Sequence, residues 1–569
     1  MVSYGAVRRW QPGPLDDTER QLKRKSESLL RLNDDFTEMA TPREWTGDAA
    51  TSARDAHRRL TDGMEQLVAL VSAARSAIGD TADALIGLGH AVEEAEGLAR
   101  AHGFGIGDDG AVNDVVAPQA VPDDQVDDVR RERQRVHAEL VDRVEQILRR
   151  AADIDNDLAD VLTKISDGRI GEGGATTLAA AAAAGARQSG LSVLEPPRGG
   201  SPADNAGWWD TLSSTEKKAI IAEHPDWIGN RDGIPFTARD AANRTRLEIE
   251  KARLQAEARQ LQADLDDNLF GGLFSNADAR LEQVEEKLAS IEAIESTLAK
   301  TGERQLLVFN TGSERADAAI ANGNVDIADH VAVFTPGFTS NVPDSLDEYD
   351  TEMNHLLLRS GDELRRYGDG GSVATVTWIG YQAPQATAGS FLSDNSVLAS
   401  GAAEAGAAKL TPFLQGIDAA RDTDAHLTAL GHSYGSTTTG LALQNNTGVD
   451  EAVFFGSPGI GTSHIDDLNV PDGHATYIEA KNDAIGDATW FGMDPTHMDG
   501  MNHASSAEAR HPGDGRILGE VIGHTSYLDD GSTSQYNTAV ITGGMSERVL
   551  EGDNRGFGDI GSWSIPGTY

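Results

Sequence analysis

From Arg304 onward the chain contains short apolar runs, each bounded by Gly, Pro or Asp. The runs are rich in Val, Phe, Thr and Ile and lie tens of residues apart, which leaves room for a helix between consecutive strands. Strands that are buried on both faces and joined by crossover helices form a parallel sheet. The pattern predicts an α/β domain with a mostly parallel sheet flanked by helices. The runs are Gln305–Asn310, His330–Thr335, Val373–Ile379, His426–Gly431, Glu451–Gly456 and Ala475–Ala480.

A serine between two glycines stands where one of these strands passes into a predicted helix. Ser433 is the centre of GHSYG, after the run His426–Leu430 and before a helix that begins near Tyr434. A serine on such a turn is held with its Oγ exposed above the carboxyl edge of the sheet. Gly431 and Gly435 are needed because a Cβ at either position would strike the neighbouring strand or helix. The pattern predicts a nucleophile, whereas the pentapeptide alone would indicate only a tight turn.

A serine hydroxyl needs a base, and the base needs an acid to orient it. In a strand-turn-helix architecture of this kind the chain order is serine, acid, histidine. Asp483 ends the stretch ATYIEAKND, two strands after Ser433. An acid in the loop after that strand lies at the same sheet edge as the serine. We therefore assign Asp483 as the acid, with Asp487 in AIGDA as the alternative.

Four histidines follow the acid. His497, His503 and His511 lie in GMDPTHMDGMNHASSAEARHPGDG, whose polar, glycine-rich character predicts a surface excursion. His524 closes the amphipathic stretch RILGEVIGH and opens a loop before the last predicted helix, from which an imidazole can turn back over the sheet edge. We assign His524 as the base, and the other three histidines remain alternatives.

An oxyanion hole needs two backbone N–H donors. One is the N–H of Tyr434, directly after the nucleophile, and the second comes from the loop after an earlier strand. That loop is Pro336-Gly337-Phe338-Thr339, in which glycine lets the backbone approach a substrate oxygen. The Phe338 N–H is therefore the predicted second donor.

Composition excludes several other classes of function. The chain has no cysteine, which rules out thiolate nucleophiles and Cys-ligated metals. No His-x-x-x-His pair is present, so we expect neither a metal nor a cofactor. The net charge of −43 argues against binding to nucleic acid or anionic membrane surfaces. No apolar stretch is long enough to span a membrane, and the N-terminus lacks the apolar region of a Sec signal peptide.

The N-terminal half is predicted to be helical. Apolar residues recur at helical spacing from Asp16 to Met39 and again from Asp48, with Pro42 and Gly47 between the two stretches. Composition then divides the chain into residues 1–170 (helical), 171–205 (a Gly/Ala/Pro-rich linker), 206–300 (helical, packing on or capping the next domain) and 301–569 (the α/β domain).

The N-terminal helix pair resembles the small WxG helical hairpins handled by type VII secretion systems. Trp45-Thr46-Gly47 at the turn carries the resemblance. It implies a helical protein partner and a type VII-like export route. The Tyr-x-x-x-Asp/Glu signal usual after the second helix is replaced here by AVEEAEGLARAHGFG. Localisation is therefore open between the cytoplasm and such export.

Residues from about Trp208 to Ile541 resemble an actinobacterial α/β-hydrolase family of unknown substrate, related in outline to cutinase- and lipase-like enzymes. The motifs WWDTLS, IGNRDGIP, VFTPGFTS, GHSYGS, FFGSPGIG and GHTSY carry the resemblance. It implies hydrolysis of a small-molecule or lipid ester through Ser433, Asp483 and His524. The chain departs from the larger hydrolase plan in one respect, because no clear strand separates Asp483 from His524. The alternative hypothesis is a secretion-linked helical interaction protein whose hydrolase domain is an effector or a non-catalytic scaffold.

Overall fold

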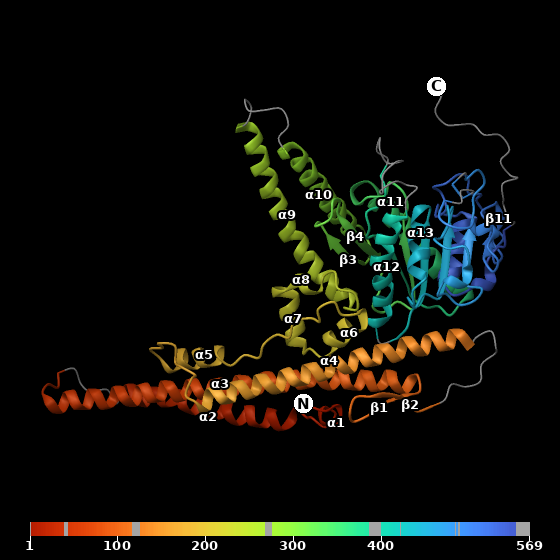
Figure 1. The fold of residues 1–569 in the computed structure, drawn as a ribbon. Helices are drawn as coiled ribbons and strands as arrows, with labels where there is room; N and C mark the ends of the chain where they lie inside the picture. Colours follow the sequence, from red (N-terminus) through yellow and green to blue (C-terminus); the bar gives the residue numbers. More distant parts are fainter. Residues whose placement is uncertain are drawn as a thin grey trace. The chain divides into compact units, whose positions relative to one another are not determined.

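The computed structural model describes residues 2–38, 44–116, 126–267, 276–385, 400–421, 423–483, 485–486 and 490–552 (Figure 1). The chain forms two compact units. The N-terminal unit holds Met1–Val121, Val136–Gly200 and Ala206–Ala219, and the C-terminal unit holds Pro122–Arg135, Ser201–Asn205 and Ile220–Tyr569. The domain boundaries expected near residues 170, 205 and 300 stay predictions.

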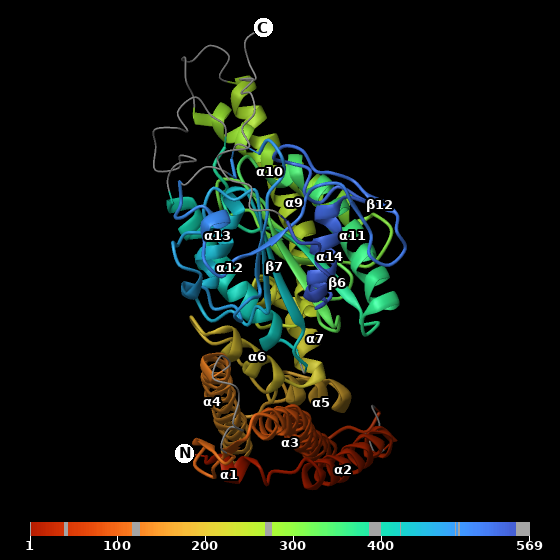
Figure 2. The ribbon, with the colours of Figure 1, turned by 90° about the vertical axis from the view of Figure 1, so that its right-hand side faces the viewer.

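The described part of the C-terminal unit is built on one sheet of eight strands, in the order β10-β9-β8-β7-β5-β6-β4-β3 (Figure 2). The strands from β10 to β6 are parallel, whereas β4 is antiparallel to both β6 and β3. The predicted mostly parallel α/β architecture is therefore confirmed. The strands are β3 (Arg304–Asn310), β4 (Asp317–Asn322), β5 (His330–Thr335), β6 (Val373–Ile379), β7 (His426–His432), β8 (Glu451–Phe455), β9 (Ala475–Ile478) and β10 (Asn502–Ala504).

Helices cover both faces of this sheet (Figure 2). Successive side chains of a strand point to opposite faces, and β5 shows both. Val331 and Val333 belong to a core with α12 and α13, whereas Ala332 and Phe334 belong to a core with α11 and α14. Complete burial of one such side chain contributes about 1.5–3 kcal/mol. The helices are α11 (Val342–Tyr367), α12 (Gly401–Ala419), α13 (Tyr434–Leu443) and α14 (Thr533–Thr542).

A helical hairpin packs at the β3 end of the sheet. It consists of α9 (Phe236–Asp267) and α10 (Asn276–Leu298), whose leucine and isoleucine stripes belong to one core. The same core includes Leu306 of β3 and Ile320 of β4, both fully buried. Three strands separate β3 from β7, so these helices lie away from the strand that ends at His432.

Two strands of the sheet were missed, and two expectations about the segment after Asp483 were wrong. Strand β10 lies between Asp483 and His524, where no strand was expected, and pairs in parallel with β9. The segment expected as a surface excursion contains β10 and reaches the interior, because His511 is only 1 % exposed. Sequence analysis also missed β4, although its six residues are all buried.

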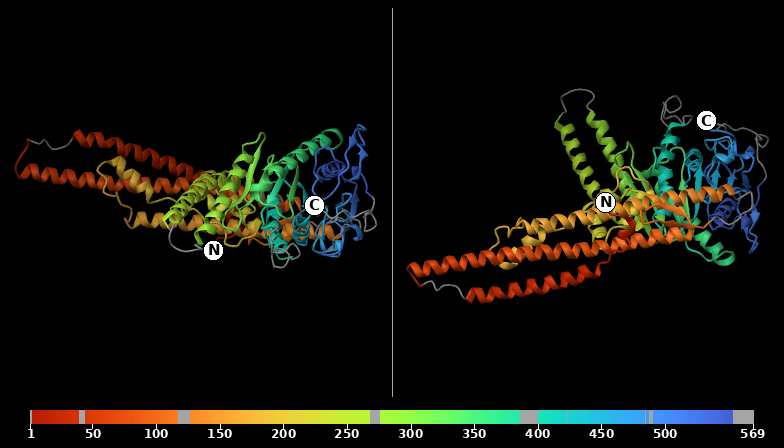
Figure 3. Two further views of the ribbon diagram at one scale, coloured as in Figure 1. Left: turned by 90° about the horizontal axis from the view of Figure 1, so that it is seen from above. Right: turned by 60° about the horizontal axis from the view of Figure 1, so that its bottom comes forward.

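The N-terminal unit is mainly helical (Figure 3). Its long helices are α2 (Gly13–Glu38), α3 (Asp48–Ala101) and most of α4 (Val126–Ser166), with α1 (Tyr4–Val7) before them and a short hairpin of β1 (Phe104–Ile106) and β2 (Val112–Asp114) after α3. Helix α2 packs on α3, and Gly47 begins α3 with a φ of 103°. Trp45 remains 47 % exposed. Helices α2 and α3 therefore form a packed pair, and Trp45, just before α3, stays at the surface.

The stretch predicted as a linker contains α5 (Leu178–Arg187), an alanine-rich helix that packs on α3. A Cβ on Gly185 would lie 2.1 Å from the Ala69 carbonyl oxygen, so glycine permits this close approach. The next helices are α6 (Pro202–Asp210), α7 (Ser214–Glu223) and α8 (Pro225–Ile228). Helix α7 begins with a reciprocal cap, in which Ser213 Oγ accepts from the Glu216 N–H and Glu216 Oε2 accepts from the Ser213 N–H. In the described ranges no helix is both long and apolar enough to cross a membrane.

Candidate active site

Ser433 lies on a strained turn between β7 and α13. Its φ of 54° and ψ of −128° are unusual for a residue with a side chain. The Ser433 N–H donates to the Phe455 carbonyl at the end of β8, 3.0 Å away, which fixes the turn against the neighbouring strand. Among the described residues, the non-glycine positions with positive φ are Thr339, Ser433 and Asn482. All three follow the carboxyl ends of strands in the same sheet, and such strain is typical of functional sites.

The glycines on either side of Ser433 are required by packing. A Cβ on Gly431 would lie 2.6 Å from the Ser436 Cα atom. A Cβ on Gly435 would lie 2.2 Å from the Thr335 carbonyl oxygen at the end of β5. Neither backbone atom can move aside without disturbing α13 or the sheet. The turn therefore tolerates a side chain at neither position.

The structure brings Ser433, His524 and Asp483 into one hydrogen-bonded chain. The distance from Ser433 Oγ to His524 Nε2 is 2.7 Å, and His524 Nδ1 lies 2.9 Å from each Asp483 carboxylate oxygen. A carboxylate only accepts, so Nδ1 carries the proton and Nε2 is free to accept from the serine hydroxyl. The serine follows β7, the acid lies in the loop after β9, and the histidine precedes α14. This arrangement has the geometry of a nucleophile, a base and an orienting acid.

Asp483 is buried but fully supplied with hydrogen-bond donors. Burial by itself would raise the pKa of this carboxyl, but the hydrogen bonds from His524, Tyr527 and the Ile485 N–H bring it below its ordinary value. Tyr527 Oη donates to Asp483 Oδ2 at 2.6 Å, and the Ile485 N–H donates to Oδ1 at 3.0 Å. Asp483 therefore stays ionised beside the imidazole at neutral pH.

Gly456, at the end of β8, makes room for the acid. Its φ is 47°, and a Cβ there would lie 2.3 Å from Asp483 Oδ2, 2.9 Å from Tyr527 Oη and 3.1 Å from His524 Nδ1. Gly456 belongs to the motif FFGSPGIG, whose sequence gives no sign of this role. No pattern within the motif could have supplied it, because the three side chains come from two later segments of the chain.

His432, next to Ser433, holds the backbone of His524. Its Nε2–H donates to the His524 carbonyl oxygen at 2.6 Å, and the two imidazole rings lie 4.9 Å apart, centre to centre. Burial, together with the nearby His524, lowers the pKa of His432 to about 4. A neutral His432 can lie against a second imidazole without charge repulsion. This role was also missed, because it depends on a contact across 92 residues.

The predicted oxyanion loop lies against Ser433. A Cβ on Gly337 would lie 2.7 Å from Ser433 Cβ and 3.0 Å from the Tyr434 nitrogen, so the two backbone segments are in direct contact. Phe338 follows immediately and is half-buried, and its N–H has no hydrogen-bond partner among the described residues. Both predicted donors thus belong to segments that meet beside Ser433.

Residues after β6 hold this loop in place. Tyr381 Oη donates to the Pro336 carbonyl at 2.8 Å, and the Thr339 N–H donates to the Pro384 carbonyl at 2.9 Å. The Thr339 N–H is therefore occupied within the loop region.

The alternative site residues lie elsewhere. His511 Nε2 donates to Glu363 of α11 at 3.0 Å. His503 is on β10 with its ring edge toward Tyr477, and His497 is exposed in the short 3₁₀ helix Pro495–His497. Asp487 lies outside the described residues. Across the described ranges, no group of three or more His, Asp or Glu side chains is arranged to hold a metal ion.

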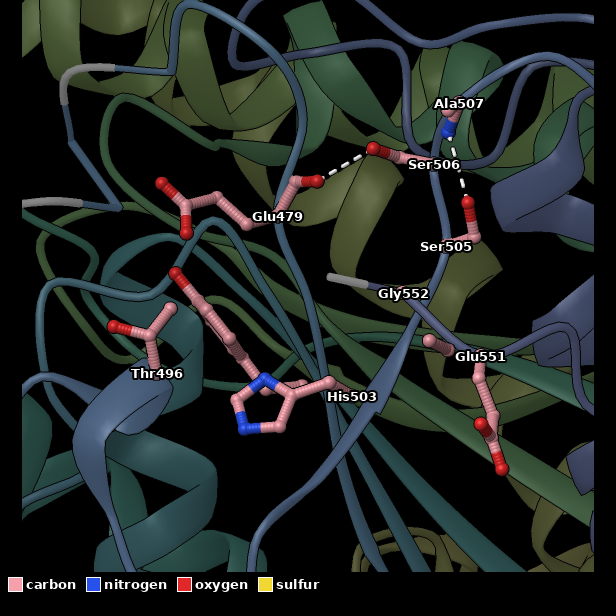
Figure 4. A pocket seen from close by; sticks show the side chains of 10 residues that line it. Glu479, Thr496, His503, Ser505, Ser506, Ala507, Glu551 and Gly552 are labelled. Atoms are coloured by element: carbon pink, nitrogen blue, oxygen red, sulfur yellow. Dashed lines mark hydrogen bonds between the residues drawn. The ribbon is translucent and has the colours of Figure 1, made fainter. Parts of the chain in front are cut away.

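A polar cavity of about 100 Å³ lies at the ends of β9 and β10 (Figure 4). Its lining includes Tyr477, Glu479 and His503 but none of the three residues of the hydrogen-bonded chain. The Ser506 hydroxyl donates to the Glu479 carbonyl at 2.5 Å and ties the segment after β10 to the start of the acid loop. The cavity is therefore a neighbour of the acid loop rather than part of the site.

Comparison with known proteins gives a family. A family model described as an alpha/beta hydrolase matches residues 312–493. An uncharacterized protein of Mycobacterium tuberculosis is 33% identical over 237 residues, which cover 40% of this chain and 86% of that protein. A second uncharacterized M. tuberculosis protein is 28% identical over 300 residues, which cover 51% of this chain and 44% of that protein.

Solved structures also resemble the chain, although at low scores. A cold-adapted esterase from an Arctic intertidal metagenomic library aligns with a TM-score of 0.27 and 11% identity, over 44% of this chain and 96% of the esterase. An esterase from Pyrobaculum calidifontis aligns with a TM-score of 0.28 and 12% identity, over 47% of this chain and 93% of that esterase.

Proposed function

The chain belongs to the alpha/beta hydrolase family, and we propose that it is a serine hydrolase that cleaves a carboxylic ester through Ser433, His524 and Asp483. The observation that carries the proposal is the 2.7 Å contact between Ser433 Oγ and His524 Nε2, with Nδ1 of the same ring 2.9 Å from Asp483. A serine that merely closes a turn needs neither a base at its hydroxyl nor a buried carboxylate behind that base.

The proposed reaction is acyl transfer in two steps. His524 Nε2 takes the hydroxyl proton as Ser433 Oγ attacks the ester carbonyl carbon. The negative charge that develops on the carbonyl oxygen is stabilised by the N–H groups of Tyr434 and Phe338. The alcohol leaves with the proton from His524, and an acyl-enzyme remains. Water, deprotonated by His524, then attacks the acyl carbon and releases the carboxylic acid.

The role of Asp483 in this scheme is electrostatic and geometric. Its carboxylate keeps the His524 proton on Nδ1 and stabilises the imidazolium that forms in each step. The hydrogen bonds that hold its pKa below the ordinary value keep the charge present throughout. The same donors, including Tyr527, leave the carboxylate few other orientations.

Reaction with a fluorophosphonate probe tests the proposal, because the probe phosphonylates only an activated serine. We expect the wild-type chain to react with 1:1 stoichiometry and a modified peptide that contains Ser433. Ser433→Ala should remove the reaction, and His524→Ala should slow it by roughly 10³-fold or more. Equal labelling of wild type and Ser433→Ala, or an unreactive folded wild type, would contradict the enzymatic function.

Hydrolysis of p-nitrophenyl esters tests the substrate class. A series from acetate to palmitate should be hydrolysed by wild type and not by Ser433→Ala, and the chain length with the highest kcat/KM distinguishes small-molecule from lipid esters. If the probe labels Ser433 but no ester of the series is cleaved, the serine hydrolase proposal survives and the ester specificity fails.

A further inference from the structure

Tyr527 joins the acid to the end of the strand that precedes it. Its hydroxyl donates to Asp483 Oδ2 at 2.6 Å and accepts from the Ala480 N–H at 2.9 Å. Ala480 follows β9, and Asp483 lies three residues further along. One hydroxyl group therefore bridges the strand end and the carboxylate of the same loop, from a residue more than 40 positions later in the sequence.

The direction of the Tyr527 hydroxyl is fixed by its two partners. The backbone N–H of Ala480 can only donate, so it occupies a lone pair of the hydroxyl oxygen and the hydroxyl proton points to the carboxylate. Tyr527 is 2 % exposed and its ring packs near Phe455, with ring centres 5.7 Å apart. A buried ring leaves the hydroxyl no room to turn to water.

The backbone at the acid needs such a restraint. Asn482, directly before Asp483, has a φ of 63°, which places it in the left-handed region. This region is uncommon for residues other than glycine, and the surrounding structure must maintain it. The bridge from Ala480 through Tyr527 to Asp483 closes the strained segment on both sides.

We propose that Tyr527 is a positioning residue of the site, which fixes the Asp483 carboxylate toward His524 and shares its negative charge. The inference rests on the proposed function, because the catalytic role of Asp483 is part of that function. Tyr527 touches neither Ser433 nor a substrate in this scheme and acts only through the acid.

The hydrogen bond from Tyr527 to Asp483 also affects how the rate of labelling depends on pH. His524 can accept the serine proton only while its Nε2 is free, so a second proton on the ring produces the acid limb of the rate profile. The Tyr527 hydrogen bond draws part of the Asp483 charge away from the ring, which weakens the attraction for that second proton. Without the hydroxyl, the full carboxylate charge faces the ring, and the acid limb of the rate profile moves to higher pH.

The experiment compares fluorophosphonate labelling rates from pH 4 to 9 for wild type, Tyr527→Phe and Tyr536→Phe. Tyr536 is the matched control, because it is fully buried in α14 and its hydroxyl donates only to the Arg548 carbonyl, at 3.2 Å. We expect Tyr527→Phe to react roughly tenfold more slowly at its plateau, with an acid limb displaced to higher pH. Tyr536→Phe should keep the labelling rate and the acid limb of wild type.

The measurements distinguish failure of the Tyr527 inference from failure of the proposed function. If wild type reacts at Ser433 and Tyr527→Phe has the same rate and acid limb, Tyr527 is only a core residue and the inference fails. If folded wild type reacts no faster than Ser433→Ala, the proposed function fails and takes this inference with it.

A second substitution keeps the test decisive if Tyr527→Phe does not fold. Replacement of Tyr527 by 3-fluorotyrosine keeps the ring and the hydroxyl but makes the hydroxyl a stronger donor. The acid limb should then move to lower pH than in wild type. An unchanged limb in the folded fluorotyrosine protein would overturn the inference.

Discussion

Replacement of Gly456 by alanine should disable the site while leaving the fold in place. The added Cβ would lie 2.3 Å from Asp483 Oδ2, whereas Cβ atoms essentially never come within 3.0 Å of a neighbouring atom. Gly456 is at the end of β8 and cannot retreat without breaking the hydrogen bond from its own N–H to the Ile478 carbonyl, 3.1 Å away. The carboxylate is the part that moves.

The distance that Asp483 Oδ2 has to move determines how far the labelling rate of Gly456→Ala falls. The oxygen has to shift by about 0.7 Å, the difference between 2.3 Å and 3.0 Å. A misplacement of about 1 Å in a catalytic arrangement costs on the order of 10²-fold in rate. The left-handed φ of 47° adds about 1–2 kcal/mol of backbone strain for any residue with a Cβ. We therefore expect a labelling rate roughly 100-fold below wild type, with a modest loss of stability.

The chain provides a control that carries the strain without the collision. Gly473, between β8 and β9, has a φ of 79° and no atom within 4 Å of an added Cβ. Gly473→Ala should lose similar stability, measured by thermal unfolding, but keep the wild-type rate of fluorophosphonate labelling. The comparison separates backbone strain from displacement of the acid.

One result would refute the reasoning. If Gly456→Ala is folded and labels within threefold of Gly473→Ala, the acid is not held where the structure places it, or its position does not limit the rate. A shift in unfolding temperature alone, equal in the two variants, would show strain and nothing more.

Three other predictions test separate parts of the structure. Gly337→Ala should reduce labelling of Ser433 by roughly 100-fold in a folded protein, because its Cβ would lie 2.7 Å from Ser433 Cβ; near-normal labelling would exclude close contact between the two loops. Burial and the neighbouring His524 lower the pKa of His432 from 6.5 to about 4 in the fold. As the pH drops from 6.5 to 4 the unfolded chain takes up this proton before the folded one, so the free energy of unfolding falls by about 3 kcal/mol. Denaturant unfolding of the C-terminal unit at several pH values should show this loss in wild type and a smaller one in His432→Gln; identical pH dependence would contradict it. Ser213→Ala removes the cap of α7 and should cost roughly 1 kcal/mol, seen in calorimetry as a lower unfolding temperature.

Much of the fold and the candidate site could be predicted from the sequence because the decisive patterns are local. A strand, a sharp turn with glycine on both sides and a helix are consecutive in the chain, so Ser433 could be identified from its neighbours alone. Chain order and the rule that parallel strands end at one sheet edge then led to Asp483 and His524. The structure brings these residues together, and their catalytic roles stay predictions until the labelling experiment is done.

The strands that were missed share a physical cause. β4 reads DAAIAN, which is short and rich in small residues, and it is recognisable as a strand only between β6 and β3. β10 has three residues and owes its conformation to pairing with β9. For such short segments, the partner strand supplies the hydrogen bonds and the burial that local preference does not.

The sequence by itself determined the α/β architecture, the sharp turn at Ser433 and the order of the candidate site residues, because each depends on residues adjacent in the chain or on the general geometry of parallel sheets. The tertiary structure alone decided how Asp483 and His524 are held. Gly456, His432 and Tyr527 come from three segments, and each acts through a contact with a residue at least 27 positions away. Hydrogen bonds and steric contacts act through space, so a side chain's role becomes visible only when folding has brought its partner within about 3 Å.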